Sequence, residues 1–217
     1  MSTRSTWLIA LTGTFILTLS LADIAATKFI VFSGVVAPGG VFLFAIIFVV
    51  RDMLHKTAGA AYVRQTIAIA AALNVAVALY LFWIARLPAP DFFGFAEPWQ
   101  AIFSLAPAIV TGSIIAAVVS QLVNTSIYQW LWNRGRSQWE RSVGSNLVSL
   151  SVDSMLFTGI AFVILPPLLG AEPISIEDAL VRVASGQTLI KLVIMLAMTP
   201  LLYLVPSNPD LEPARAA

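Results

Sequence analysis

Residues 143–165 read VGSNLVSLSVDSMLFTGIAFVIL, and Asp153 is the one charged side chain among them. An α-helix rises 1.5 Å per residue, so about 20 mainly apolar residues cross the hydrocarbon core of a bilayer. This stretch is long enough and apolar enough to do so. It therefore predicts a transmembrane helix.

The composition extends that prediction to the whole chain. The 217 residues are 59% hydrophobic and only 11% charged, whereas soluble domains carry about a quarter charged residues. The sequence therefore predicts an all-α integral membrane protein, a six-transmembrane-helix bundle forming a single transmembrane domain over residues 1–217. Besides 143–165, the expected spans are about 7–32, 38–54, 60–85, 107–132 and 185–205. The start of the first span resembles a signal peptide, but its apolar run is longer than a signal peptide needs, so it is expected to be retained.

Proline and glycine residues indicate where the spans begin and end, and charged residues indicate how the spans are oriented. Pro38-Gly39-Gly40 indicates either a broken helix or a tight turn before the second span, and Pro166-Pro167 is expected to end the fifth. Basic residues cluster in the expected second and fourth loops, whereas acidic residues dominate the third and fifth. Since cytoplasmic loops are enriched in Lys and Arg, both the N- and C-termini are predicted to be cytoplasmic.

Several function classes are excluded. The net charge of +1 gives no reason to expect a nucleic-acid partner. The chain lacks cysteine and has a single histidine, His55, which excludes disulfides, thiolate sites and a His-rich metal site. There is no P-loop and no serine or di-aspartate protease signature. We therefore expect no enzyme, no metal and no cofactor.

Polar side chains recur at helical spacing inside the expected spans. Ser142, Asn146, Ser149 and Asp153 are spaced four, three and four residues apart, so they share one face of a helix, and Phe157 continues it. The span 107–132 carries a matching stripe whose members include Ser113, Gln121, Asn124 and Tyr128. In the last span, Gln187 and Lys191 form an i,i+4 pair.

Charges within lipid are costly and tend to face a bundle interior or a wet cavity. The charged candidates are Asp23, Lys28, Asp52, Asp153 and Lys191. Simpler roles are open for several polar residues: Asn74, Ser113 and Ser149 as interhelical hydrogen-bonding groups, Lys28 as a snorkelling side chain, and Asp52 as a helix end at the cytoplasmic surface. For Asp153 the alternatives are a functional carboxylate or an ion pair with Lys191 or Lys28 that only fixes packing. The accompanying polar stripes favour function.

The ordered motifs resemble the VUT family of prokaryotic membrane proteins, the queuosine precursor or vitamin uptake transporters. The resemblance covers roughly 21–200. It rests on Ala22-Asp23 with Lys28, Ala37 to Val41, Arg51-Asp52 with Gly59, Ser145-Asn146, Val152 to Ser154 with Phe157, and Gly186-Gln187 with Lys191. The chain departs from the family at Gln121 and Asn124, where many members are acidic, and at His55-Lys56, where others have Glu or Gln.

The resemblance implies import of 7-cyano- or 7-aminomethyl-7-deazaguanine through a prokaryotic inner membrane. In that case Asp153 is expected to accept hydrogen bonds from the N–H groups of the pyrimidine edge. The predicted substrate-binding residues are Asp153, Asn146, Gln187, Lys191, Asp23, Lys28, Asn124, Gln121 and Phe157. Two alternatives are a substrate-binding subunit of an ATP-driven importer and a structural membrane protein without transport activity. A homo-oligomer or an energising subunit is left open as a partner.

Overall fold

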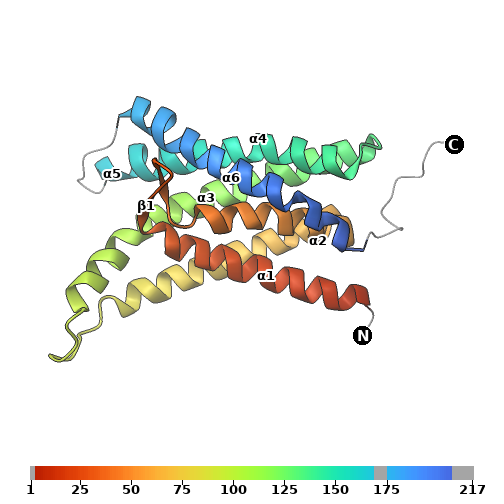
Figure 1. The fold of residues 1–217 in the computed structure, drawn as a ribbon. Helices are drawn as coiled ribbons and strands as arrows, with labels where there is room; N and C mark the ends of the chain where they lie inside the picture. Colours follow the sequence, from red (N-terminus) through yellow and green to blue (C-terminus); the bar gives the residue numbers. More distant parts are fainter. Residues whose placement is uncertain (1–2, 169–174, 207–217) are drawn as a thin grey trace.

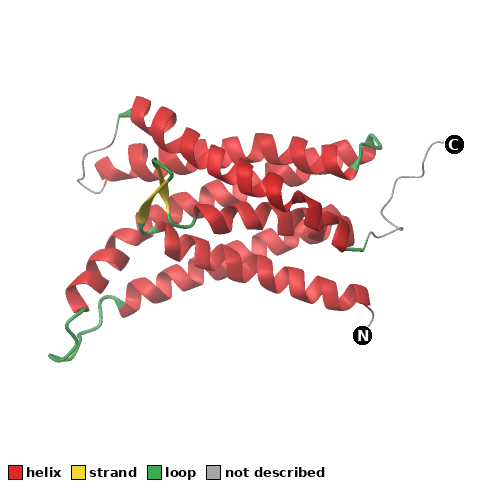
Figure 2. Cartoon of the chain, viewed as in Figure 1, coloured by secondary structure: helices red, strands yellow, loops and turns green. Residues whose placement is uncertain are grey.

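The structure is a computed structural model that describes residues 3–168 and 175–206. Nearly every element is helical (Figure 2), and the helices lie side by side in one bundle (Figure 1). The α-helices are α1 Thr3–Ala26, α2 Val41–Ile84, α3 Ala96–Asn133, α4 Gln138–Thr158, α5 Leu165–Leu168 and α6 Ser185–Met198; the π-helices are η1 Gly159–Ile164 and η2 Asp178–Ala184, and a 3₁₀-helix, η3, covers Thr199–Leu204. Strands β1 Phe29–Phe32 and β2 Val35–Pro38 complete the described part of the chain.

Five helices of the described residues are long and apolar enough to cross a membrane: Ser5–Ala26, Val41–Ile84, Val110–Asn133, Gln138–Ile164 and Asp178–Leu204. Many large apolar side chains face outward from them, such as Leu17, Leu79 and Met155, as a lipid-facing surface requires. These features confirm the prediction of an all-α membrane protein.

Helix α2 is too long for a single crossing. Its 44 residues would measure about 66 Å if straight, twice the hydrocarbon thickness of a bilayer. The helix is interrupted at Gly59, whose φ of 84° and ψ of 173° belong to a backbone region essentially reserved for glycine. Its orange first half and yellow second half run in opposite directions along the bundle (Figure 1). Gly59 lies in the gap between the predicted spans 38–54 and 60–85.

A β-hairpin replaces the expected end of the first span. Helix α1 ends at Ala26 rather than near residue 32, and β1 and β2 pair antiparallel with Phe32 opposite Val35. Ser33 and Gly34 both have positive φ, 49° and 79°, which is the geometry of a tight two-residue hairpin turn. The β-branched and aromatic side chains around this turn favour strands over a continued helix.

Of the two alternatives at Pro38-Gly39-Gly40, the structure has the turn: Gly39 and Gly40 join β2 to α2 and pack against the last turn of α1. The Gly39 N–H donates to the Lys28 carbonyl at 2.7 Å. A Cβ at Gly40 would lie 2.1 Å from the Ala22 carbonyl oxygen, and one at Gly39 would lie 2.8 Å from that of Ala25. The two glycines therefore allow α2 to begin in direct backbone contact with α1.

Other helix ends differ from the sequence prediction. Helix α3 starts at Ala96 and not near residue 107, and α4 starts at Gln138, where Ser137 and Glu140 form a capping box. The expected end at Pro166-Pro167 is wrong, because α5 carries both prolines to Leu168. The preceding π-helix η1 widens the backbone spacing, with the Leu165 N–H donating to Ile160, and wide turns of this kind accommodate residues that disturb an α-helix. The expected acidic loop at 170–178 lies mostly outside the described residues.

The close contact at Gly40 generates a stability prediction. Gly40→Ala should lower the thermal unfolding midpoint of the detergent-solubilised protein, because the added methyl group meets backbone atoms that cannot rotate away; overpacking of this kind costs about 1–3 kcal/mol or more. Gly13→Ala on α1 is the matched control, since a Cβ there meets nothing within 4 Å and alanine favours a helix. An unchanged midpoint for Gly40→Ala would contradict the packing described.

Candidate functional site

A buried ion pair joins α4 to α6. The Lys191 ammonium donates to Asp153 Oδ2 at 2.6 Å, and both side chains are almost completely buried. The second carboxylate oxygen of Asp153 accepts a hydrogen bond from Ser120 of α3 at 2.9 Å. Three helices therefore converge on one carboxylate, which the spacing on α4 had placed on an inward face.

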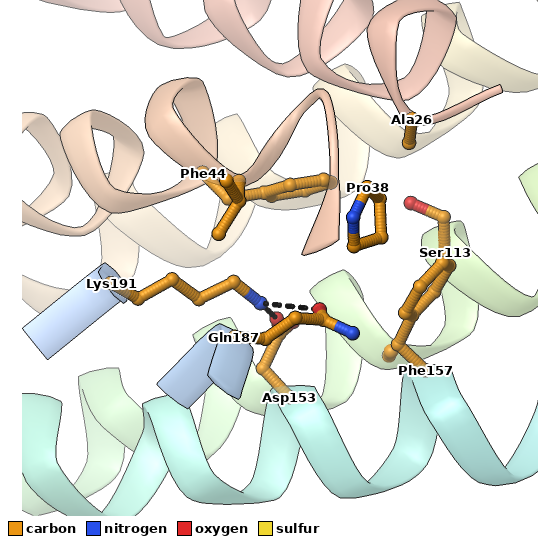
Figure 3. A pocket seen from close by; sticks show the side chains of 10 residues that line it. Ala26, Pro38, Phe44, Ser113, Asp153, Phe157, Gln187 and Lys191 are labelled. Atoms are coloured by element: carbon orange, nitrogen blue, oxygen red, sulfur yellow. Dashed lines mark hydrogen bonds and ion pairs between the residues drawn. The ribbon is translucent and has the colours of Figure 1, made fainter. Parts of the chain in front are cut away.

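A narrow cavity lies beside this ion pair, between α1, the hairpin, α2, α3, α4 and α6 (Figure 3). The space among its lining side chains measures about 270 Å³, its open part included, and nearly all of it consists of gaps too narrow for a water molecule. The lining is apolar and aromatic, with a few polar groups at one wall: Ala26, Pro38, Val41, Phe44, Ser113, Ala116, Asp153, Phe157, Gln187 and Lys191. An apolar cavity with a few convergent polar groups is the common form of a small-molecule site.

Gln187 and the aromatic rings are the adaptable part of the cavity wall. Gln187 donates to Thr158 at 3.4 Å and accepts from Lys191 at 3.5 Å, distances at the long limit of a hydrogen bond. The Gln187 amide is therefore held only weakly by its hydrogen-bond partners in the protein. Phe44 faces the Lys191 ammonium at 5.4 Å from its ring centre, and Phe157 packs edge-to-face on Phe162. Figure 3 shows Phe44 and Phe157 on different sides of the cavity.

Asp23 lies behind the cavity wall and is not among the lining residues. It is buried, and its carboxylate accepts hydrogen bonds from Asn74 of α2 and Ser113 of α3. Ser113 itself lines the cavity. Asn74 and Ser113, two of the three residues expected to act as interhelical hydrogen-bonding groups, therefore do link helices, and they do so through Asp23.

A second polar network, which we call the inner network, comprises Arg51, Asp52, Gln121, Asn124, Ser142, Asn146 and Ser149. The expectation that Asp52 marks a helix end at the surface is wrong: Asp52 is completely buried, because the first half of α2 continues past it to Gly59. Arg51 donates to Asp52 at 2.6 Å, and Ser142 and Asn146 donate to the other oxygen of Asp52.

The predicted residues Asn146, Gln121 and Asn124 belong to this inner network rather than to the cavity wall. Arg51 donates to Gln121 at 2.9 Å and to Asn146 at 2.8 Å, while Asn124 donates to Asn146 and Ser149. One nitrogen of Arg51, one of Gln121 and one oxygen of Asn124 are buried with no hydrogen-bond partner among the described residues. The inner network is therefore dense but incompletely satisfied.

His55 and Lys56 fall between the predicted spans 38–54 and 60–85 and were expected in a cytoplasmic loop. Both are also inside the bundle. His55 is buried, lies 2.8 Å from Gln129 through Nε2, and packs on the rings of Tyr128 and Trp132. Lys56 donates to the carbonyl oxygens of Leu202 and Val205 at 2.8 Å each. Those carbonyls end the last helical segment, where a cation is favourable. The loop assignment is wrong because the chain turns only at Gly59.

Lys28 is exposed beyond the end of α1 and does not line the cavity. Sequence reasoning missed Arg51 and Phe44 as members of these polar and aromatic groups. The sequence did contain a signal for Arg51. The residue directly follows a long apolar run, which indicates a position within a helix rather than in a loop. The described residues contain no group of three His, Cys, Asp or Glu side chains that could hold a metal ion.

Comparisons with known proteins find matches to membrane transporters. The model of a family described as putative vitamin uptake transporter matches residues 38–205. A relative from Bacillus subtilis (strain 168), named "Probable queuosine precursor transporter", is 23% identical over 185 residues, which cover 84% of this chain and 77% of the relative. No solved structure matches the chain.

The inner network generates a second prediction. Asp52→Ala should destabilise the protein by about 3–5 kcal/mol, because it leaves the buried Arg51 without its counter-charge. Denaturation of the purified protein in detergent measures the loss. Arg136→Ala, which removes an exposed pair with Glu140 at 3.3 Å, is the control and should change stability little. Equal effects of the two substitutions would contradict a structural role for Asp52.

Proposed function

The chain belongs to the family of putative vitamin uptake transporters, and we propose that it imports 7-cyano-7-deazaguanine, 7-aminomethyl-7-deazaguanine or a closely related heterocyclic solute. It is a transporter by family and not an enzyme. The name of the Bacillus subtilis relative supports a queuosine precursor as the solute. The observation that carries the proposal is the Asp153–Lys191 pair at the wall of a mainly apolar cavity.

The chemistry of a deazaguanine fits this wall. Its pyrimidine edge presents adjacent N–H donors, and the Asp153 carboxylate can accept from both. Lys191, the one of the two predicted lysines that reaches the cavity, donates to the neighbouring carbonyl oxygen, and the loosely held amide of Gln187 satisfies a remaining polar edge. Phe157 or Phe44 packs on the planar ring, as aromatic side chains do with nucleobases.

Binding by this route requires the cavity to widen and the ion pair to change partners. The present contacts make this feasible, because Asp153 exchanges one charged partner for a pair of substrate donors and Lys191 keeps a nearby acceptor. A solute with only one polar group would leave Asp153 or Lys191 buried without a full partner. Such a mismatch is strongly unfavourable, which makes the pair a source of specificity.

The same proposal includes six membrane crossings with both ends in the cytoplasm. The reversal of α2 at Gly59 supports two crossings within that helix. Helix α1 begins and η3 ends at the same end of the bundle (Figure 1). Exposed Arg64 follows the reversal of α2, and exposed Arg134 and Arg136 lie in the α3–α4 connection. The enrichment of basic residues in cytoplasmic loops favours that side as cytoplasmic. A prokaryotic inner membrane is the corresponding location.

We propose that Asn146, Asn124 and Gln121 act after the cavity, as polar groups along the inward route. They lie on α3 and α4, and on α4 Asn146 precedes Asp153 by about two helical turns. Partnerless buried groups on Gln121 and Asn124 are available to a solute that passes. Lys28, exposed at the other end of α1, is then left outside the binding step.

A salvage assay tests the transport function directly. A bacterium that cannot synthesise queuosine precursors, grown with a low concentration of precursor, should regain modified tRNA only when this protein is expressed. Uptake by the purified protein alone in liposomes would exclude a need for a separate ATP-driven subunit. Binding without uptake in liposomes would favour such a subunit, and no binding at all would favour a structural membrane protein.

Substitutions in the cavity generate the third prediction. Asp153→Asn should reduce precursor uptake tenfold or more, because a hydrogen bond to a charged group contributes about 1.5–3 kcal/mol and the carboxylate is proposed to make two. Gln187→Ala should weaken uptake less, with little effect on folding, since its hydrogen bonds in the protein are long. Labelled-precursor uptake at matched membrane expression measures both.

Ser151→Ala is the control on the same helix, because Ser151 bonds only to the Leu147 carbonyl of its own helix. It should leave uptake unchanged. Normal uptake by a well-expressed Asp153→Asn variant would exclude Asp153 as the substrate carboxylate.

A further inference from the structure

We propose that Asp23 is a proton-binding site which couples solute import to a proton gradient. This inference rests on the proposed transport function and assigns its energy source. The proton is taken up by the Asp23 carboxylate from water on the outer side and released as a proton to the cytoplasm. No bond of the solute changes in this step.

The first observation is that Asp23 is a buried carboxylate whose hydrogen-bond partners are all neutral. Its side chain accepts from the Asn74 amide and the Ser113 hydroxyl, and the residue is only 3% exposed. No Lys, Arg or His forms an ion pair with it within residues 3–168 and 175–206. An isolated ionised carboxylate is strongly disfavoured in such surroundings, and a group in that position is normally neutralised by a proton.

The other two buried membrane carboxylates provide the comparison within the same molecule. Asp153 is paired with Lys191 and Asp52 with Arg51, each at 2.6 Å. Those pairs remain satisfied while both partners are charged. Asp23 has no charged partner in the described residues, so it becomes neutral only by binding a proton. In this it differs from the other two carboxylates.

The second observation is the position of Asp23 next to the cavity. Ser113 both donates to Asp23 and lines the cavity. Only the Ser113 hydroxyl group therefore separates the Asp23 carboxylate from water that enters the open cavity. The charged groups that face this region are Asp153 from α4 and Lys191 from α6; α2 contributes the neutral Asn74, α3 the neutral Ser113, and the hairpin Pro38. The region therefore holds two carboxylates and one ammonium group, and that ammonium group is paired with Asp153.

This charge balance supplies the coupling. With the cavity open, water stabilises an ionised Asp23. When the cavity closes around a solute, Asp153 and Lys191 balance each other and an ionised Asp23 would be left as an excess negative charge. The closed, loaded transporter therefore requires a proton on Asp23, and the expected stoichiometry is one proton for each solute molecule.

Proteoliposomes with the purified protein test the coupling, using labelled 7-cyano-7-deazaguanine and a membrane potential held at zero. An inward proton gradient of one pH unit should drive accumulation to about tenfold by the wild-type protein at one proton per solute. Added solute should also acidify the lumen, as reported by a trapped pH-sensitive dye. Asp23→Asn, which imitates the protonated side chain, should lose accumulation and acidification while exchange of internal for external solute is still measurable.

The outcomes separate this inference from the proposed function. Wild-type protein that exchanges the solute but neither accumulates it nor moves protons would overturn the coupling and leave the transport function standing. Accumulation by Asp23→Asn in response to the gradient would overturn the role of Asp23. Absence of any exchange by the wild-type protein would instead count against the proposed solute.

Infrared spectroscopy decides the protonation of Asp23 without any solute. On titration to low pH, the wild-type protein in lipid should gain the absorption of a protonated carboxylic acid, and Asp23→Asn should lack this gain. Asp153→Asn is the matched control and should retain the absorption, because Asp153 is ion-paired in the structure. Identical spectra for wild type and Asp23→Asn over the whole pH range would refute the proton site, even if Asp23→Asn proved unable to transport.

Discussion

The Asp153–Lys191 ion pair illustrates the constraint on which the rest of the structure depends. A charged side chain inside this bundle must be neutralised by a group that also lies inside the bundle. Apolar side chains cover the outside of the helices, and lipid is as apolar as they are, so hydrophobicity alone does not decide how each helix is rotated. The buried polar groups do. Asp153 fixes α4 against α6 and α3, Asp52 with Arg51 fixes α2 against α4, and Asp23 ties α1 to α2 and α3. The cavity lies beside two of these fixed points, because Asp153 lines it and Ser113, which donates to Asp23, lines it as well.

The polar groups differ in how firmly they are held, and this difference has a functional meaning. In the inner network, Asp52 accepts from Arg51, Ser142 and Asn146, so no single exchange of partners frees it. At the cavity, Gln187 makes only long hydrogen bonds and Asp153 has Ser120 and Lys191 as partners. A solute competes more easily with the second arrangement. The inner network is then a barrier that a solute at the cavity does not displace by itself, which is what alternating access demands of the closed side.

Hydrophobic periodicity was sufficient to predict the helices and the inward face that carries Asp153, because both follow from local spacing. It could not predict the β-hairpin, since residues 29–38 are as apolar as the helix before them and only the Ser33-Gly34 turn distinguishes them. Asp52 and His55 were misplaced for a related reason. Their charge and polarity suggested a loop, whereas the chain actually turns at Gly59, a residue whose importance lies in its backbone conformation. Pairing between distant residues, such as Arg51 with Gln121, leaves no local pattern at all.

The positions at which this chain departs from its family are explained by the same constraint. At Gln121 and Asn124 the family resemblance implies acidic residues in many members, and both positions lie in the inner network and not at the cavity wall. There Arg51 and Asp52 already balance each other, so two neutral amides keep the layer neutral without another cation. An acid at either position would need a proton or an additional partner. The departure therefore changes the charge of the inward route while leaving Asp153, Lys191 and Gln187 in place, and the selectivity proposed for the cavity does not depend on it.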